Sequence, residues 1–192
     1  MGKEKLAIHM NCSGKHAGFL ACSKLNGWDL ESYLSPEHPL QLRVKELIEQ
    51  FSGEKISQTT IDGCGAPLFA LSTLGLARAI SRFSQEAPEL VKAATDNPEL
   101  IGDSNTPDAV FLRAGLFSKL GAEGVFTVAT QDGHAIALKI ADGSLRAAPA
   151  VCLALLEKHS LIDPKAASAI RSETEVLAMG GSQVLGKLVS KI

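Results

Sequence analysis

The sequence predicts an α+β fold in which helices come first and an antiparallel sheet comes late. Apolar residues recur at helical spacing over 40–51, which is typical of an amphipathic helix. Two β-rich runs, 125–130 and 134–140, flank a Gln-Asp-Gly connection that is typical of a hairpin. No internal repeat or linker interrupts the 192 residues, a length that supports one sizeable core. We therefore expect a single domain over 1–192.

The first half of the chain is predicted to be mainly helical. An alternating run at 5–10 indicates a short strand, and Asn11 or Ser13 is a suitable N-cap for a helix over 14–25. An Asn-Gly pair at 26–27 ends that helix. The other elements expected here are a helix at 40–51, a strand at 55–61, a helix that begins at Pro67 and continues over 68–83, and a short helix at 88–95.

The second half is predicted to supply the sheet and the helices that cover it. A loop over 97–107 leads into one or two helical turns at 108–114, and a third strand at 116–120 joins the hairpin. Later elements are helices at 145–158 and 164–171 and a last strand at 183–189. Together these elements predict helices packed on an antiparallel sheet.

The composition is that of an ordinary soluble globular protein, with 45% hydrophobic and 21% charged residues. The net charge is −2 and there is no run of Lys or Arg, so we expect neither a nucleic acid nor an anionic membrane as partner. The longest apolar runs, such as 147–156, are too short to cross a bilayer. Because no apolar segment follows Lys3 and Lys5, no secretory signal is expected and the cytoplasm is the predicted location.

The familiar short catalytic motifs fail on inspection. The Gly-Lys pair at 14–15 lacks the glycine and the hydroxyl residue of a phosphate loop, since His9 and His16 stand there. Ser52 and Lys55 have the Ser-x-x-Lys spacing of a nucleophile and its base. That pair falls at a predicted helix end in a hydrophilic turn, which is a poor place for catalysis.

The four cysteines, at 12, 22, 64 and 152, form no C-x-x-C pair and no disulfide framework. Cys12 stands three residues before Lys15 and four before His16, so these side chains can meet on one side of a helical turn. Cys64 lies in a second, glycine-lined turn. From spacing alone two interpretations stay open. The cysteines hold a zinc ion between the two turns, or they are core thiols next to helix starts, which is the commoner case.

Four short blocks, taken in order, resemble those of a known family. They are Asn-Cys-Ser-Gly-Lys-His-Ala-Gly at 11–18, Thr-Ile-Asp-Gly-Cys-Gly-Ala-Pro at 60–67, Lys-Leu-Gly-Ala-Glu-Gly at 119–124 and Ala-Leu-Lys-Ile-Ala-Asp-Gly at 137–143, followed by Arg146. With these blocks the chain resembles the thermolabile, rhizobial-type asparaginases, the L-asparaginase II family. The resemblance extends from about residue 6 to the C-terminus.

The resemblance implies a fold like that of serine β-lactamases and glutaminases, and hydrolysis of L-asparagine to L-aspartate and ammonia. It implies that Cys12, Lys15 and Cys64 bind zinc. A lysine ligand must first lose its proton, although its reference pKa is about 10.4. A nearby divalent cation and partial burial both favour the neutral amine.

The same resemblance assigns three further residues to the substrate pocket. Asp62 is expected near the α-amino group of the substrate or the fourth position of the metal, with a catalytic role. Lys119 begins a Lys-Leu-Gly that is similar to the Lys-Thr/Ser-Gly element of β-lactamase-like folds, and it would pair with the substrate carboxylate or tune the nucleophile. Leu120 departs from that element because it has no hydroxyl. His16 would orient a ligand or donate to the substrate.

The nucleophile is the main departure from the family. Members carry a Ser-x-x-Lys well before the block at 11–18, so the chain is expected to be the C-terminal portion of such a protein. We expect an asparaginase-like amidohydrolase that is incomplete without that segment, with a homodimer or a separate N-terminal half as the expected partners. The alternative is a non-catalytic remnant that binds zinc or an amino acid.

Overall fold

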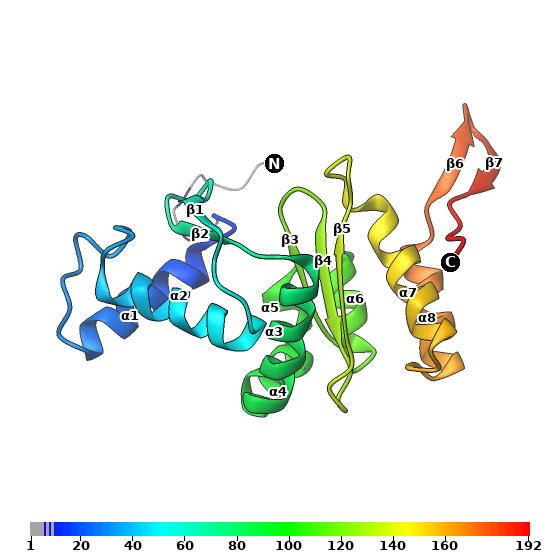
Figure 1. The fold of residues 1–192 in the computed structure, drawn as a ribbon. Coiled ribbons are helices and arrows are strands. Elements are labelled where there is room, and N and C mark those ends of the chain that lie inside the picture. The colour runs from blue at the N-terminus through cyan, green and yellow to red at the C-terminus, as the bar shows by residue number, and fades with distance from the viewer. Residues whose placement is uncertain (1–5, 7, 9) are drawn as a thin grey trace. The chain divides into compact units, whose positions relative to one another are not determined.

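The computed structural model describes residues 6, 8 and 10–192, and it confirms the predicted α+β class (Figure 1). Contacts within the chain divide it into two compact units, Met1–Leu71 and Ser72–Ile192, each of which is described by itself. The single domain expected over 1–192 stays a prediction. Of the strand predicted at 5–10, residues 5, 7 and 9 lie outside the described part of the chain, and residues 6, 8 and 10 are not in a strand.

The first unit consists of two helices and a small hairpin: α1 (Ser13–Leu25), α2 (Pro39–Ser52), β1 (Gln58–Ile61) and β2 (Pro67–Ala70). Helix α2 begins where the ring of His38 accepts the N–H of Leu40 at 3.1 Å, and it ends at Gly53, whose φ of +71° favours glycine. The expected cap of α1 was wrong. Its N-cap residue is Cys12, and no side chain caps it.

Pro67 does not begin a helix, contrary to the sequence-based expectation. It opens β2, opposite Ile61, and the first position of a strand suits a residue without an N–H. Helix α3 (Thr73–Glu86) starts six residues later, where the hydroxyl of Ser72 accepts the N–H of Gly75 at 2.8 Å. The segment between β1 and β2 is therefore the turn of a hairpin, and this turn forms half of the candidate site.

The second unit contains a three-stranded antiparallel sheet in the order β3-β4-β5, which confirms the predicted hairpin and third strand. Its elements are α3 (Thr73–Glu86), α4 (Pro88–Asp96), α5 (Pro98–Ile101), α6 (Pro107–Arg113), β3 (Phe117–Gly121), β4 (Val125–Ala129), β5 (Ala135–Lys139), the 3-10 turn η2 (Leu145–Ala147), α7 (Ala148–Lys158), α8 (Pro164–Thr174), β6 (Leu177–Gly180) and β7 (Gln183–Lys187). Two expectations were incomplete. The predicted loop contains the short helix α5, and the last strand pairs with β6, which the sequence did not reveal.

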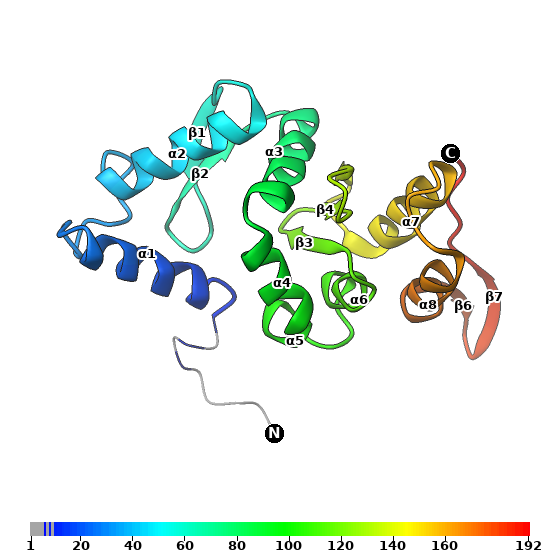
Figure 2. The same ribbon diagram turned by 90° about the horizontal axis from the view of Figure 1, so that it is seen from below.

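Side chains alternate between the two faces of this sheet, and helices cover both faces (Figure 2). On one face, Phe126 is fully buried and meets Phe111 of α6 edge-on at 5.3 Å, in a core that α7 and α8 complete. On the other face, Phe83 of α3 stacks on Phe117 with ring centroids 5.2 Å apart. Lys119 and its partner Thr127 share the face of Phe117, while Leu120 points to the core.

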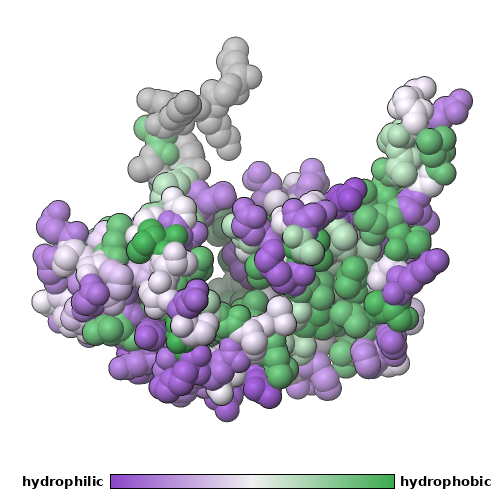
Figure 3. Space-filling model, turned by 45° about the horizontal axis from the view of Figure 1, so that its top comes forward, coloured by the Kyte–Doolittle hydropathy of each residue, from purple (hydrophilic) through white to green (hydrophobic). Residues whose placement is uncertain are grey.

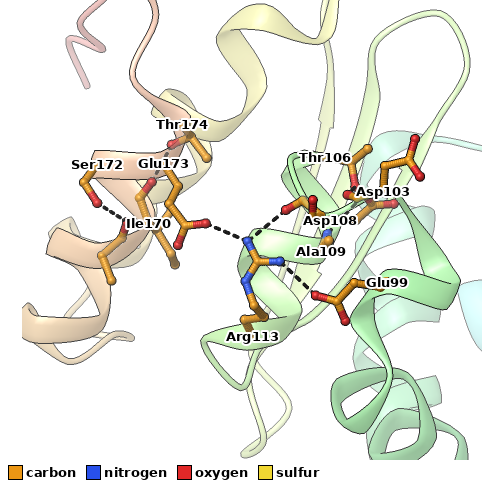
Figure 4. A network of polar contacts seen from close by, with 12 residues as sticks. Glu99, Asp103, Thr106, Asp108, Ala109, Arg113, Ile170, Ser172, Glu173 and Thr174 are labelled. Atoms are coloured by element: carbon orange, nitrogen blue, oxygen red, sulfur yellow. Dashed lines mark hydrogen bonds and ion pairs between the residues drawn. The ribbon is translucent and has the colours of Figure 1, made fainter.

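Two peripheral features complete this unit. Arg113 at the end of α6 donates to Glu99 at 3.3 Å and to Glu173 at 2.6 Å, which ties α6 to α5 and α8 (Figure 4). The β6–β7 hairpin projects from the unit with every residue of both strands exposed (Figure 3). Among the described residues, no helix has the length and apolar character needed to cross a membrane.

Candidate functional site

Two turns of the first unit bring a cluster of metal-ligating groups together. Cys12 stands at the start of α1, and Asp62 and Cys64 lie in the turn between β1 and β2. The two sulfur atoms and a carboxylate oxygen of Asp62 all lie within 4.8 Å of one another. All three residues are half-buried. Two segments about fifty positions apart in the sequence therefore contribute donors to one site.

Local backbone structure holds each turn in place. The carbonyl of Cys12 accepts the N–H of His16 at 3.0 Å, so Cys12 and Lys15 lie in the same first turn of α1. In the second turn, the N–H of Asp62 donates to the carbonyl of Ala66 at 2.8 Å. Gly65 has a φ of +87°, a conformation that a residue with a side chain rarely adopts. The Asp-Gly-Cys-Gly sequence thus fixes the direction in which Asp62 and Cys64 point.

Lys15 joins this cluster through Asp62. Its Nζ lies 3.1 Å from Oδ2 of Asp62, and the Cys64 thiol donates to the same oxygen at 3.4 Å. The hydrogen bond from Lys15 holds the pKa of Asp62 below its ordinary range, with further contributions from Cys64 and the N–H of Gly63. Asp62 is therefore an ionised acceptor at neutral pH.

Opposing effects act on the pKa of the other members. Burial alone would lower the pKa of Lys15, but hydrogen bonds to Cys64 and Asp62, together with weaker electrostatic interactions with the two cysteines, raise it overall. Burial is the first cause that raises the pKa of the Cys12 thiol, and its hydrogen bond with Cys64 adds to this, while the Lys15 charge opposes it. Without a cation, the cluster thus consists of protonated Lys15, paired with the Asp62 carboxylate, and a neutral Cys12 thiol beside them.

The donor chemistry of the cluster fits zinc. Zn²⁺ prefers sulfur and nitrogen ligands with an occasional carboxylate, and four such groups converge here: two thiols, one carboxylate and one amine. A bound cation would require the thiols and the amine to lose their protons. The sequence expected Asp62 either at the metal or at the substrate, and the structure places it beside both thiols and the lysine.

His16 makes its contacts on another side. Its Nδ1 lies 2.6 Å from the hydroxyl of Tyr33, and its ring lies edge-on to that of Tyr33 with centroids 5.7 Å apart. Its Nε2 is buried and makes no hydrogen bond with any described residue. The substrate-binding role of His16 stays a prediction. Tyr33 was missed from the sequence, although it is the only tyrosine in the chain.

Lys119 belongs to the second unit, where it lies in the middle of β3 with its side chain 52% exposed. Its Nζ donates to the carbonyl of Leu120 at 2.8 Å and lies 3.6 Å from Oδ2 of Asp108. The absence of a hydroxyl at 120 has a structural reason, because Leu120 points away from Lys119 and packs against the core. Nothing in the sequence had singled out Asp108.

The Ser-x-x-Lys pair does not form a nucleophile and base. The hydroxyl of Ser52 is buried and hydrogen-bonds to the carbonyls of Glu49 and Glu54 at 3.4 Å. Lys55 pairs with the carboxylate of Glu49 at 2.6 Å. Ser52 thus caps the end of α2.

The fold and the cluster define an α+β protein with a candidate cation site made of two thiols, a carboxylate and a lysine amine. The L-asparaginase II family matches this chain over residues 1–189, and the chain belongs to that family. The predicted family is thereby confirmed, and with it an asparaginase-like amidohydrolase lineage whose substrate is an amino acid. A comparison with curated proteins gives no match. The β-lactamase-like fold stays a prediction.

Proposed function

We propose that this chain contributes the metal site and part of the substrate pocket of an enzyme that hydrolyses L-asparagine to L-aspartate and ammonia. The observation that carries the proposal is the convergence of Cys12, Asp62 and Cys64, with Lys15 on the carboxylate, in a member of an asparaginase family. A random pair of core cysteines would not require two charged groups beside them. These charges are expected where a cation or a polar substrate binds.

In this proposal Cys12, Lys15 and Cys64 hold zinc. When bound, zinc supplies a fixed positive charge that polarises an oxygen ligand. Asp62, released from its ion pair with Lys15, is then free to accept the α-ammonium group of the substrate. An ionised carboxylate suits this role because it can accept several charge-assisted hydrogen bonds.

Lys119 is proposed to bind the substrate carboxylate or to tune the nucleophile, and His16 to orient a polar group through Nε2, which has no hydrogen-bond partner among the described residues. The geometry at Ser52 supports the inference that the nucleophile comes from a Ser-x-x-Lys segment outside these 192 residues. That segment would belong to a separate polypeptide or to a longer form of this one. The isolated chain is then expected to release little ammonia.

A second candidate is a non-catalytic protein that uses the same cluster to bind zinc or to sense an amino acid. The observation that favours it is the capping role of Ser52, which removes the Ser-x-x-Lys pair that the sequence offered as nucleophile and base. Both candidates share the metal site, so they differ in turnover and not in zinc content.

Zinc per chain, measured by elemental analysis of the purified protein, tests the shared site. Because zinc is usually bound by four ligands, the four donors of this cluster make one site, and we expect about one zinc per wild-type chain. Cys64→Ser should lose this zinc. Cys22→Ser is the matched control, because Cys22 lies on α1 outside the cluster and should leave the zinc content unchanged. A folded wild-type protein without zinc would contradict the proposed metal site.

Ammonia release from L-asparagine separates the two functions. It is measured for this chain alone and after mixing with an N-terminal fragment that carries a Ser-x-x-Lys. Activity that appears only in the mixture, and disappears in Lys119→Met, supports the hydrolase. Zinc binding without turnover in either sample supports the non-catalytic alternative.

A further inference from the structure

Asp108 is a buried carboxylate that the proposed function does not use. It lies in the first turn of α6, and its side chain is only 1% exposed. Its Oδ1 accepts the backbone N–H of Ala109 at 3.2 Å, whereas its Oδ2 is buried and accepts no hydrogen bond from the described residues. A carboxylate that is removed from water in this way is costly unless a cation compensates it.

Lys119 is the one cation within 4.0 Å of Asp108 in the part of the chain that the structure describes, with Nζ 3.6 Å from Oδ2. The carboxylate is enclosed on its other side by Gly102. A Cβ on that residue would lie 2.9 Å from Oδ1. Because Oδ2 has almost no exposed surface, a substrate cannot reach it, and its effect is exerted through Lys119.

The ammonium of Lys119 has three N–H donors. One donates to the carbonyl of Leu120 at 2.8 Å, and a second is directed by the charge of Asp108. These two contacts limit the rotation of a group that is otherwise on a flexible stem. The third N–H remains for a ligand, on a side chain that is half exposed.

A second lysine on the same face of the sheet shows what is particular to Lys119. Lys139 of β5 shares the face of Lys119 by strand register, and its Nζ donates to the next carbonyl, that of Ile140, at 2.9 Å and also to the carbonyl of Glu123. Among the described residues no carboxylate lies within ion-pair distance of Lys139. The sheet thus presents two lysines that each donate to the next carbonyl: a second backbone carbonyl holds Lys139, whereas a buried carboxylate faces Lys119.

We propose that Asp108 is a positioning residue for Lys119, which holds the ammonium so that a single N–H is presented to an anionic group of the ligand. The role assigned to that ligand, the carboxylate of an amino acid, rests on the proposed function. The pairing of Asp108 with Lys119 does not. The two claims can therefore be tested separately.

The pairing is tested by NMR of protein labelled with ¹⁵N-lysine, in which a side-chain ammonium gives a signal when it is held and its exchange with water is slowed. We expect a Lys119 signal in the wild type, assigned by its loss in Lys119→Arg, and no such signal in Asp108→Asn. The Lys139 spectrum is the internal control and should be the same in both proteins. A Lys119 signal that is unchanged in folded Asp108→Asn would overturn the proposal.

Thermal unfolding of two further variants provides an independent test, which does not depend on Asp108→Asn being folded on its own. Lys119→Met leaves the buried carboxylate unpaired and should lower Tm, and Asp108→Asn added to it should restore at least half of the loss. Wild-type stability in Lys119→Met would show that the carboxylate does not depend on this lysine, and it would also overturn the proposal.

The ligand is tested by calorimetric titration with L-aspartate, the product of the proposed reaction. Loss of a well-held charged hydrogen bond should raise Kd about tenfold in Asp108→Asn. If the NMR signals behave as expected and the wild type binds no L-aspartate, the pairing holds and the proposed function fails. If L-aspartate binds equally to both proteins, Asp108 does not position Lys119 for this ligand.

Discussion

Lys15 and Asp62 form an ion pair, with Nζ 3.1 Å from Oδ2, that joins the first turn of α1 to the turn between β1 and β2. The same oxygen accepts the thiol of Cys64. A lysine that serves as a zinc ligand must give up both its proton and this partner. The ion pair keeps the two turns together, and in the proposed metal site the cation would replace it.

Lys15→Arg separates the charge of this residue from its capacity as a ligand. A guanidinium stays protonated in proteins, so it can keep an ion pair with Asp62 but cannot donate a lone pair to zinc. We expect the zinc Kd, measured by competition with a chelator, to rise by at least about tenfold. Even the loss of a residue that only hydrogen-bonds to a metal ligand weakens metal binding by this factor. Lys24→Arg, in the last turn of the same helix, is the control. Equal zinc affinity in Lys15→Arg and wild type would exclude Lys15 as a ligand.

Glu49 gives the first unit a defined dependence of stability on pH. The hydrogen bond from Lys55 holds the pKa of the Glu49 carboxyl below its ordinary value of 4.5, and the N–H of Ile56 adds to this effect. A carboxyl with a lowered pKa in the folded state stabilises the protein fully above the unfolded-state value, and this contribution is lost as the pH falls through the folded pKa. Glu49→Gln should therefore lower Tm at pH 7, and the difference should narrow below about pH 4.5.

Thermal unfolding of Glu49→Gln and wild type between pH 3 and pH 7, with an added chelator, checks this prediction. Glu46→Gln is the control, because Glu46 forms an exposed pair with Arg43 and makes only a minor charge contribution at Lys55, and exposed pairs contribute little. A Tm difference that stays constant across this pH range would show that the Glu49 contribution does not come from its charge.

The sequence was most informative where periodicity and turn residues acted locally. The helix at 40–51 and the hairpin at 125–140 were predicted because each depends on neighbours in the chain. Pro67 was misassigned because a proline opens helices and strands alike, and its pairing with Ile61 decides between them. The first strand of the last hairpin, at 177–180, was missed.

The candidate site was predictable only in part for the same reason. Block resemblance indicated Cys12, Lys15 and Cys64, but their convergence depends on the β1–β2 hairpin, which spacing alone does not determine. In the sequence Asp108 looks like any acidic residue in the first turn of a helix, where a negative charge interacts favourably with the helix dipole. Its burial follows from the packing of α6 on β3, which no local pattern records.

Cys152 should behave differently from the other cysteines toward thiol reagents. It is fully buried in the core, and burial raises the pKa of its thiol to about 12. The thiolate is the reactive form, so at pH 8 Cys152 should remain unmodified by iodoacetamide for as long as the protein is folded. Peptide mapping by mass spectrometry checks this, with half-buried Cys22 as the internal comparison. Equal labelling of Cys152 and Cys22 would show that the core opens readily.

Gly102→Ala should disturb the second unit at Thr106 and Asp108. The added Cβ would meet Oγ1 of Thr106 first and would lie 2.9 Å from Oδ1 of Asp108, so the threonine side chain, the carboxylate or the backbone must move. Overpacking of this kind costs about 1–3 kcal/mol in the free energy of unfolding, which urea titration measures.

Gly18→Ala is the matched control for this substitution, because a Cβ there meets nothing within 4 Å and the residue lies inside α1. Alanine is favoured over glycine at such a helical site by about 0.5–1 kcal/mol, so this variant should be slightly more stable than wild type. In Gly102→Ala the displaced carboxylate should also weaken the NMR signal of Lys119. Stability and signal that both equal those of the wild type would mean that Asp108 has room to move, and the close packing around its carboxylate would then have no consequence for Lys119.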